Sequence, residues 1–115
     1  MKDIEFLGTS LDDLREFPEA ARRRSGFQLH LVQSGRDPDD WKPMSTVGSG
    51  CREIRMRDPG GTYRVFYVAV MDDVVYVLHC FQKRTQRTAK SDLDLSKQRF
   101  KEMKKIERKR HEDDE

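Results

Sequence analysis

The chain has 115 residues, of which 38% are charged and 35% are hydrophobic. A chain of this length suits one domain with a modest core and is too short for two. No run of eighteen apolar residues occurs, and residues 1–8 (MKDIEFLG) lack the apolar stretch of a signal peptide, so a membrane-spanning or secreted protein is not expected. We therefore expect a soluble, cytoplasmic protein.

The formal net charge of +2 conceals an uneven distribution of charged residues along the chain. Residues 51–110 contain 16 Lys and Arg against 8 Asp and Glu, whereas residues 1–50 contain 7 against 9. The last five residues, 111–115, add four further acidic side chains. A basic region of this size indicates a polyanionic partner.

The first 35 residues predict a short strand followed by a helical hairpin. Residues 3–8 (DIEFLG) have the composition of a strand. Ser10 is suited to cap a first helix, and Pro18 is suited to open a second helix at its first turn. The second helix is expected to end near Gly35. Its candidates for packing against the rest of the protein are Ala20, Ala21, Phe27 and Leu31.

The next segment, residues 35–50, contains Gly, Pro and Asp at the density of a loop, which Trp41 is expected to anchor. Towards the other end of the chain, Thr88 is suited to cap a last helix. Its apolar residues recur at helical spacing, while Lys and Arg fill its other face. These apolar residues are Leu93, Phe100 and Met103. We expect one domain over residues 1–105 and a charged, solvated tail over residues 106–115.

Between the loop and the last helix, three stretches rich in β-branched and aromatic residues predict consecutive antiparallel strands. They are residues 51–57 (CREIRMR), 63–70 (YRVFYVAV) and 74–84 (VVYVLHCFQKR). Asp72 and Asp73 separate the second stretch from the third with the spacing of a two-residue hairpin loop. Met71 is therefore expected to face Val74.

The two turns predict which residues face each other across these strands. A four-residue loop over residues 58–61 places Arg55 opposite Arg64, and the hairpin places Arg64 opposite Phe81. One face of the sheet is then apolar, with Ile54, Met56, Tyr63, Val65, Leu78 and Cys80. The other face gathers basic side chains, namely Arg55, Arg57, Arg64, His79 and Lys83. Such a cluster predicts a site for phosphate groups.

The cysteines and histidines predict neither a disulfide nor a metal site. Cys51 and Cys80 fall on opposite faces of the sheet in this register, so we expect both to be free thiols. No Cys-x-x-Cys pair occurs, and the three histidines lack the spacing of metal ligands. These histidines are His30, His79 and His111.

The sequence resembles a known family in the order and the motifs of its predicted strands. The motifs are Cys-x-x-Ile-Arg-x-Arg at 51–57, Tyr-Arg-Val at 63–65 and Leu-His-Cys-Phe-Gln-Lys-Arg-Thr at 78–85. Together with the basic helix that follows, they are similar to the RelE/HigB superfamily of toxins, in particular its phage-derived HigB-like branch. The resemblance implies an α+β, RelE-like fold: a small, mainly antiparallel sheet of about four strands with an N-terminal helical hairpin and a C-terminal helix.

The resemblance also implies a function. Toxins of this family belong to type II toxin–antitoxin systems and cleave messenger RNA in the ribosomal A site. They act as metal-independent endoribonucleases, or mRNA interferases, in which the ribose 2′-OH attacks the scissile phosphate. The implied partners are the ribosome, messenger RNA and a HigA-like helix-turn-helix antitoxin, with no cofactor and no membrane.

Several residues match the functional positions of the family. Arg64 corresponds to an arginine that is expected to clamp the scissile phosphate with its planar fork of donors. Arg84 matches the arginine at the end of the next strand, and with Lys83 it is expected to stabilise the leaving 5′-oxygen or hold the backbone. Arg55 matches a further basic strand residue. Additional RNA contacts are expected from Arg57, Lys42, Arg87 and Lys90.

Two residues are candidates for the general base, His79 and Glu53. Glu53 stands where the best-known RelE pattern has a further lysine. The tyrosine expected shortly after Arg84 is missing from residues 85–92 (TQRTAKSD). The sequence thus departs from the family pattern in the groups that would transfer protons.

Two other functions stay open at the level of sequence. A ParE-like gyrase poison shares the fold without needing phosphate-cleaving residues. A non-catalytic, RNA-binding phage accessory protein of the same fold agrees with Glu53 and the missing tyrosine. The lysine-rich face of the last helix fits either a solvated surface or contact with ribosomal RNA.

Overall fold

The computed structural model describes residues 1–71 and 73–113 and contains one five-stranded sheet with three helices. In chain order the elements are β1 (Asp3–Phe6), α1 (Ser10–Arg15), α2 (Glu19–Gln33), β2 (Trp41–Pro43), β3 (Cys51–Asp58), β4 (Gly61–Val70), β5 (Val74–Lys83) and α3 (Lys90–Asp113). The strand order is β1-β5-β4-β3-β2, in which β1 runs parallel to β5 and all other neighbours are antiparallel. The predicted α+β class is confirmed.

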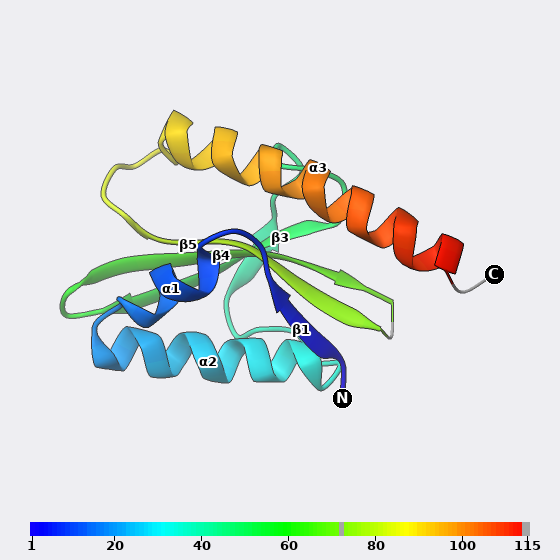
Figure 1. Ribbon diagram of the computed structural model, residues 1–115. Helices are drawn as coiled ribbons and strands as arrows, with labels where there is room; N and C mark the ends of the chain where they lie inside the picture. Colours follow the sequence, from blue (N-terminus) through cyan, green and yellow to red (C-terminus); the bar gives the residue numbers. More distant parts are fainter. Residues whose placement is uncertain (72, 114–115) are drawn as a thin grey trace.

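The sheet is covered by helices on both faces, as Figure 1 shows. Residues of α1 and α2 such as Leu14 and Leu29 pack with Ile54 and Val65 in one core cluster. On the other face, Met103 of α3 packs in a second cluster with buried residues of β3, β4 and β5. Because both faces are covered, the strands are apolar on both sides rather than strictly alternating. Charged side chains on this sheet therefore need a specific reason to be there.

The structure has one strand more than the sequence predicts. β2 lies within the segment that was expected to be a loop, and it pairs with β3 through Trp41 opposite Ile54 and Lys42 opposite Glu53. The guanidinium of Arg52 lies 3.9 Å from the centroid of the Trp41 ring, so Trp41 does anchor this segment. A strand of three residues in a Gly- and Pro-rich segment has no periodic pattern of its own.

The predicted pairing of β3 with β4 is confirmed, with Arg55 opposite Arg64. At the other hairpin, Val70 pairs with Val74, so the prediction that Met71 faces Val74 is wrong by one residue. Asp72, the first residue of the predicted two-residue turn, lies outside the described residues. A β-bulge at Leu78 then shifts the pairing of β4 with β5 by one residue, which restores the predicted register beyond the bulge.

The bulge has two consequences for the predicted faces. Arg64 does lie opposite Phe81, because the shift at the bulge compensates for the longer turn. Leu78, however, packs in the cluster under α3, and its predicted position beside Ile54 is wrong. Cys51 and Cys80 belong to different clusters, and both are free thiols as expected.

The two predicted N-terminal helices are present, but the cap of α1 and part of the buried face of α2 differ from the prediction. Thr9, and not Ser10, occupies the N-cap position of α1, while Ser10 lies inside the helix and donates a hydrogen bond to the Val77 carbonyl oxygen. α2 begins after Pro18 as predicted. Its buried face consists of Ala21, Ser25, Gln28, Leu29 and Val32. Ala20 and Phe27 lie on the exposed side of the helix, so the prediction that they pack against the rest of the protein is wrong.

Residues 106–113, which the sequence assigns to a charged, solvated tail, continue α3. α3 begins at Lys90, two residues after the predicted cap Thr88, and runs to Asp113. Tyr76 Oη donates a hydrogen bond of 2.5 Å to Glu107 Oε2, and Arg110 Nη2 lies 2.6 Å from Glu5 Oε1. These contacts tie the last turns to the sheet. Residues 114–115 of the predicted tail lie outside the described residues.

A helix that crosses a bilayer needs about 20 consecutive, mainly apolar residues, and this can be checked against the helices of residues 1–71 and 73–113. None of them combines the necessary length with sufficient apolar character.

Candidate functional site

Basic side chains gather on the face of the sheet that carries α3, at the end formed by the β3–β4 turn. One row across the strands contains Arg55, Arg64 and Phe81, and the next contains Arg57, Thr62 and Lys83. A cavity of about 620 Å³ opens here. It is lined by Arg57, Thr62, Arg64, Lys83, Arg84, Thr85 and Gln86. We refer to Arg55, Arg57, Arg64, Lys83 and Arg84 as the cationic cluster.

Arg64 is the central member of the cationic cluster and is only 8% exposed. Its Nη1 donates a hydrogen bond of 3.2 Å to the Tyr63 carbonyl oxygen, and its Nε lies 3.4 Å from Glu53 Oε2. Burial is the main factor that lowers the pKa of Arg64 from its ordinary value, and the Glu53 carboxylate opposes this effect. The guanidinium is thus held from two sides while it still lines the cavity.

Glu53 is a fully buried carboxylate beneath the cationic cluster. Besides Arg64 it has one other cationic neighbour, because Lys42 Nζ lies 3.5 Å from its Oε1. Neither carboxylate oxygen has a hydrogen-bond partner of good geometry among the described residues. The three charged groups form an ionic triad that spans β2, β3 and β4. Of the two residues considered as general base, Glu53 is therefore engaged with cations and closed to solvent.

Arg55 is also paired with a carboxylate, but at the surface. Its Nε and Nη2 lie 3.0 and 2.8 Å from the same oxygen, Oδ1 of Asp40. Both side chains are partly exposed, and they border a second cavity of about 500 Å³ at the edge of β3. Its lining residues are Arg24, Gln28, Asp39, Asp40, Arg55, Met56, Arg57 and Arg64. Arg57 and Arg64 line both cavities, so the two openings adjoin each other.

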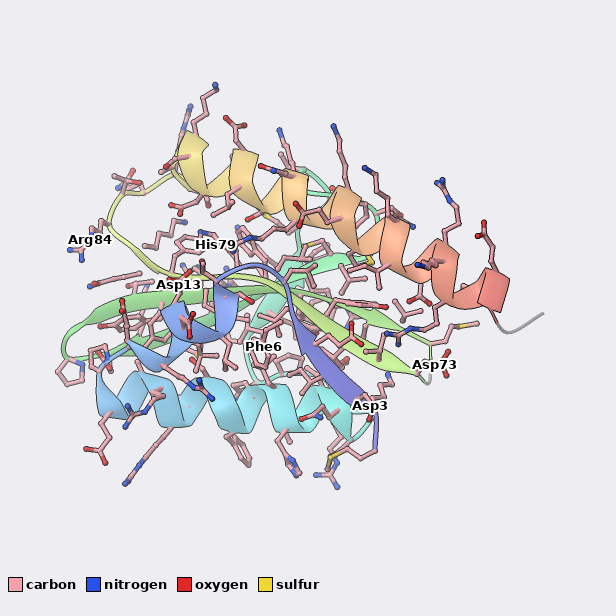
Figure 2. All side chains as sticks on the ribbon, viewed as in Figure 1. Asp3, Phe6, Asp13, Asp73, His79 and Arg84 are labelled. Atoms are coloured by element: carbon pink, nitrogen blue, oxygen red, sulfur yellow. The ribbon has the colours of Figure 1, made fainter. Side chains whose placement is uncertain are left out.

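Lys83 and Arg84 reach the same cavity although they are consecutive in sequence. β5 ends at Lys83, so Arg84 belongs to the following loop and is free of the strand alternation. In Figure 2 the Arg84 side chain projects from the loop between β5 and α3. Burial, followed by repulsion from Arg64, lowers the pKa of Lys83 below its ordinary value. A lysine with a lowered pKa releases its proton more readily than an ordinary one.

His79 lies on the same face but is closed to solvent, being 6% exposed. Its Nε2 is 2.7 Å from Oδ1 of Asp92, in the first turn of α3, and its ring stacks on Phe81 with a centroid distance of 4.8 Å. Nδ1 is buried and has no hydrogen-bond partner among the described residues. Figure 2 shows His79 between the sheet and α3. In this conformation His79 joins β5 to α3 and does not face the cavity of the cationic cluster.

Sequence reasoning missed the role of Arg99, which was grouped with the basic face of the last helix. Arg99 is 6% exposed, and its Nη1 donates a hydrogen bond of 2.9 Å to the carbonyl oxygen of Leu78, the extra residue of the bulge. Its Nη2 donates to Thr9 Oγ1 at 3.0 Å. A Cβ at Gly8 would lie 2.6 Å from Arg99 Nε, so this glycine leaves room for the guanidinium. No local pattern in the sequence distinguishes Arg99 from its exposed neighbours.

The other predicted RNA contacts are distributed differently. Arg57 lines the cavity of the cationic cluster, whereas Lys42, Arg87 and Lys90 do not. Lys42 is nevertheless connected to the cluster, because its Nζ lies 3.5 Å from Glu53 Oε1. Arg87 is exposed in the loop before α3, and the Lys90 side chain is 92% exposed and lies 3.4 Å from Asp94. Within residues 1–71 and 73–113, no group of three or more Cys, His, Asp or Glu side chains is placed so that it could hold a metal ion.

Comparisons with known proteins relate this arrangement to a fold and a family. Two similar solved structures are the isolated E. coli RelE toxin (20% identity, TM-score 0.59) and the intact E. coli RelBE toxin–antitoxin complex (19% identity, TM-score 0.53). The match to isolated RelE covers 75% of this chain and 89% of the RelE chain. The match to the RelBE complex covers 74% of this chain and 100% of the matched chain of the complex. They show that the chain has a RelE-like fold, as the sequence predicts.

Two further comparisons concern the sequence itself. No curated protein matches this chain. A family model described as "Phage derived protein Gp49-like (DUF891)" matches residues 12–101, which include the whole cationic cluster. The chain therefore belongs to the family of phage-derived, Gp49-like proteins.

Proposed function

We propose that this protein is the toxin of a type II toxin–antitoxin system and that it cleaves messenger RNA on the ribosome. The observation that carries the proposal is the position of Arg64: its largely buried side chain lines a cavity that is also lined by Arg57, Lys83 and Arg84. Such an arrangement suits a phosphodiester that changes charge during reaction. The RelE-like fold and the Gp49-like family support the same conclusion.

The proposed reaction is an in-line displacement within the RNA chain. The 2′-oxygen forms a bond to the adjacent phosphorus, the bond from phosphorus to the 5′-oxygen breaks, and a proton passes from the 2′-hydroxyl to the leaving oxygen through the protein or solvent. Arg64 would donate to the non-bridging oxygens, where negative charge increases in the transition state. Lys83 would protonate the leaving oxygen, because its lowered pKa makes it a better acid than an ordinary lysine.

A second candidate function is RNA binding without cleavage, as in a phage accessory protein. The observation that favours it is that neither candidate base is available to RNA. His79 is bonded to Asp92, and Glu53 is buried between two cations. A protein that only holds the phosphate backbone needs the cations and no proton acceptor. Both functions therefore use the same binding surface. They differ in whether the bound RNA is cleaved.

A cell-free translation reaction tests the proposal directly. Adding the protein to translating ribosomes should produce messenger fragments cut at codon-phased positions, with cyclic phosphate and 5′-hydroxyl ends, and a chelator should not prevent this. Arg64→Lys keeps the positive charge beside Glu53 but removes the planar fork, so cleavage should be lost while the fold is kept. Arg22→Ala, an exposed arginine of α2, serves as the matched control.

The outcomes separate the candidates. RNA that is bound but intact supports the accessory protein and contradicts the toxin. Induction in cells that triggers a DNA-damage response while messages stay intact would instead indicate a ParE-like gyrase poison.

The proposed toxin requires an antitoxin, and we infer a small helix-turn-helix protein of the HigA type. One of the matching solved structures is described as a toxin–antitoxin complex, which supports an antitoxin as partner. The neighbouring reading frame identifies the candidate. Co-expression should give a complex that purifies with both chains and no longer cleaves RNA. Two chains that purify separately would contradict the pairing.

A further inference from the structure

The buried Glu53 has no explanation in the packing of the sheet alone. Its neighbours on the same face, such as Cys51 and Phe66, are apolar and belong to the core cluster under α3. A carboxylate in such a place loses its hydration and persists as an ion only if nearby charges compensate. The two compensating charges are the cations of Lys42 and Arg64. The carboxylate is therefore part of the arrangement of the cationic cluster.

The contacts of Arg64 show what this carboxylate does. Glu53 faces the Nε edge of the guanidinium, and the Tyr63 carbonyl oxygen accepts from Nη1. Nη1 is thus hydrogen-bonded to the protein, and Nε is buried in an ion pair with Glu53, 3.4 Å from Oε2, without a hydrogen bond of good geometry. Nη2 has no protein acceptor among the described residues. Because the guanidinium is planar, fixing two nitrogens fixes the direction of the third. The free donors are therefore directed before any phosphate arrives.

The second oxygen of Glu53 extends the arrangement to another strand. Lys42 comes from β2, opposite Glu53, and its ammonium lies 3.5 Å from Oε1. Its side chain is 46% exposed, so it can contact solvent or a ligand while it stays close to the carboxylate. The electrostatic field of Glu53 also reaches Lys83, where it raises the pKa against the larger opposing effects of burial and Arg64.

We propose that Glu53 is a positioning residue, which fixes the guanidinium of Arg64 for a backbone phosphate and holds Lys42 at the edge of the same site. This assigns Glu53 neither to proton transfer nor to simple core filling. The inference rests on the proposed function for its substrate, which is an RNA phosphodiester. The geometry of the triad itself can be tested without any cleavage assay.

The first experiment measures the side-chain Nε–H signal of Arg64 by ¹H–¹⁵N NMR of the full chain. The signal is assigned by its absence in Arg64→Lys. In the unmodified protein it should be visible and exchange slowly with water, because Nε is buried against Glu53. Glu53→Gln should shift the signal and accelerate its exchange. Glu107→Gln removes another largely buried carboxylate, beside Tyr76, and should leave it unchanged.

The second experiment separates binding from cleavage. Glu53→Gln removes a negative charge beside the two cations of Lys42 and Arg64, so a non-cleavable 2′-deoxy oligonucleotide should bind at least as tightly. The slope of log K against log salt should become steeper by about 0.7, as expected for one more phosphate contact on a single strand. The rate constant of cleavage should fall on the order of a hundredfold, because the guanidinium is no longer directed. Glu53→Asp, which keeps the charge but is shorter, should bind like the unmodified protein and cleave slowly.

The readouts distinguish failure of this inference from failure of the proposed function. If the unmodified protein cleaves RNA but Glu53→Gln leaves both the Arg64 signal and the rate constant unchanged, the positioning role is wrong and the function stands. If no RNA is cleaved and the Arg64 signal still depends on Glu53, the positioning of the guanidinium stands and only the reaction is wrong. Rapid exchange of the Arg64 signal in the unmodified, folded protein would contradict the inference without any substitution.

Discussion

Arg99 Nη1 donates a hydrogen bond of 2.9 Å to the carbonyl oxygen of Leu78 and thereby holds the one residue that interrupts the ladder between β4 and β5. The bulge sets the register of everything beyond it on β5. Arg64 lies opposite Phe81, and Thr62 opposite Lys83, because of this single shift. A buried arginine 21 residues away in sequence therefore contacts the bulge that sets the pairing of β4 with β5, the strands of Arg64 and Lys83.

Arg99→Met is expected to destabilise the protein. The substitution keeps the apolar part of the side chain but leaves the Leu78 carbonyl oxygen and Thr9 Oγ1 without their charged donor. Loss of such hydrogen bonds should lower the free energy of unfolding by about 2–3 kcal/mol. Urea denaturation followed by circular dichroism measures this value. Gln98→Met, an exposed neighbour on the same helix, is the control, and an equal effect of both substitutions would contradict the role of Arg99.

Arg64→Ala is expected to reduce stability as well as activity, because Arg64 is buried and paired. Removing one partner of a buried ion pair typically costs about 3–5 kcal/mol, and Lys42, which stays beside Glu53, should keep the cost near the lower value. Thermal melting measures the change. The double substitution Arg64→Ala with Glu53→Gln should recover part of the stability without recovering cleavage. A single variant as stable as the unmodified protein would mean that the pair contributes nothing to folding.

His79→Gln is expected to change stability more than catalysis. The imidazole connects β5 to the first turn of α3 through Asp92, and neither of its nitrogens faces the cavity of the cationic cluster. Loss of this bond should cost about 1–2 kcal/mol, while the rate constant of RNA cleavage should be largely unchanged. Asp92→Asn should behave in the same way. A stable His79→Gln protein that has lost cleavage would restore His79 as the general base.

The two thiols predict a loss of stability in alkaline solution. Burial raises the pKa of the Cys51 thiol from 9.0 to about 12 and also raises that of Cys80. A thiol whose pKa is higher in the folded protein favours folding below its ordinary pKa, and this contribution decreases as the pH rises from about 9 towards the folded value. Urea denaturation at about pH 8 and about pH 10 should therefore show lower stability at the higher pH.

Substitution of both cysteines by alanine provides the control for this prediction. The doubly substituted protein should lose less stability than the unmodified protein over the same pH interval. An identical loss in both proteins would assign the effect to other groups, such as Tyr76, whose pKa is also raised by burial.

The pairing of Arg55 with Arg64 follows from sequence because the turn between β3 and β4 is short and the alternation of side chains is clear. The hairpin between β4 and β5 shows where such reasoning fails. Its predicted turn is one residue too short, and the bulge adds one residue on β5, so two errors cancel at Arg64. The carbonyl oxygen of the bulge residue accepts a hydrogen bond from Arg99, and contacts between distant segments leave no periodic signal in either one.

The partners of the cationic cluster were equally invisible in the sequence. Glu53 was recognised as a departure from the family pattern, but its place between Lys42 and Arg64 depends on β2, which the sequence did not predict. Asp92 stands in the first turn of α3, where an acidic residue is explained by the helix dipole alone. The sequence thus identified the cations, and the structure identified the acidic side chains that orient or neutralise them.

The bulge at Leu78 also lies between the hairpin end of β4 and β5 and the residues of the cationic cluster on these strands. The connection between Val70 and Val74 lies on one side of the bulge, and Arg64, Phe81 and Lys83 lie on the other. A peptide tag or a fluorescent label inserted into this connection should leave the cluster in register, because the strand pairs beyond the bulge and the hydrogen bond from Arg99 to Leu78 lie outside the connection. The β4–β5 connection is therefore the natural place to attach a reporter to this protein.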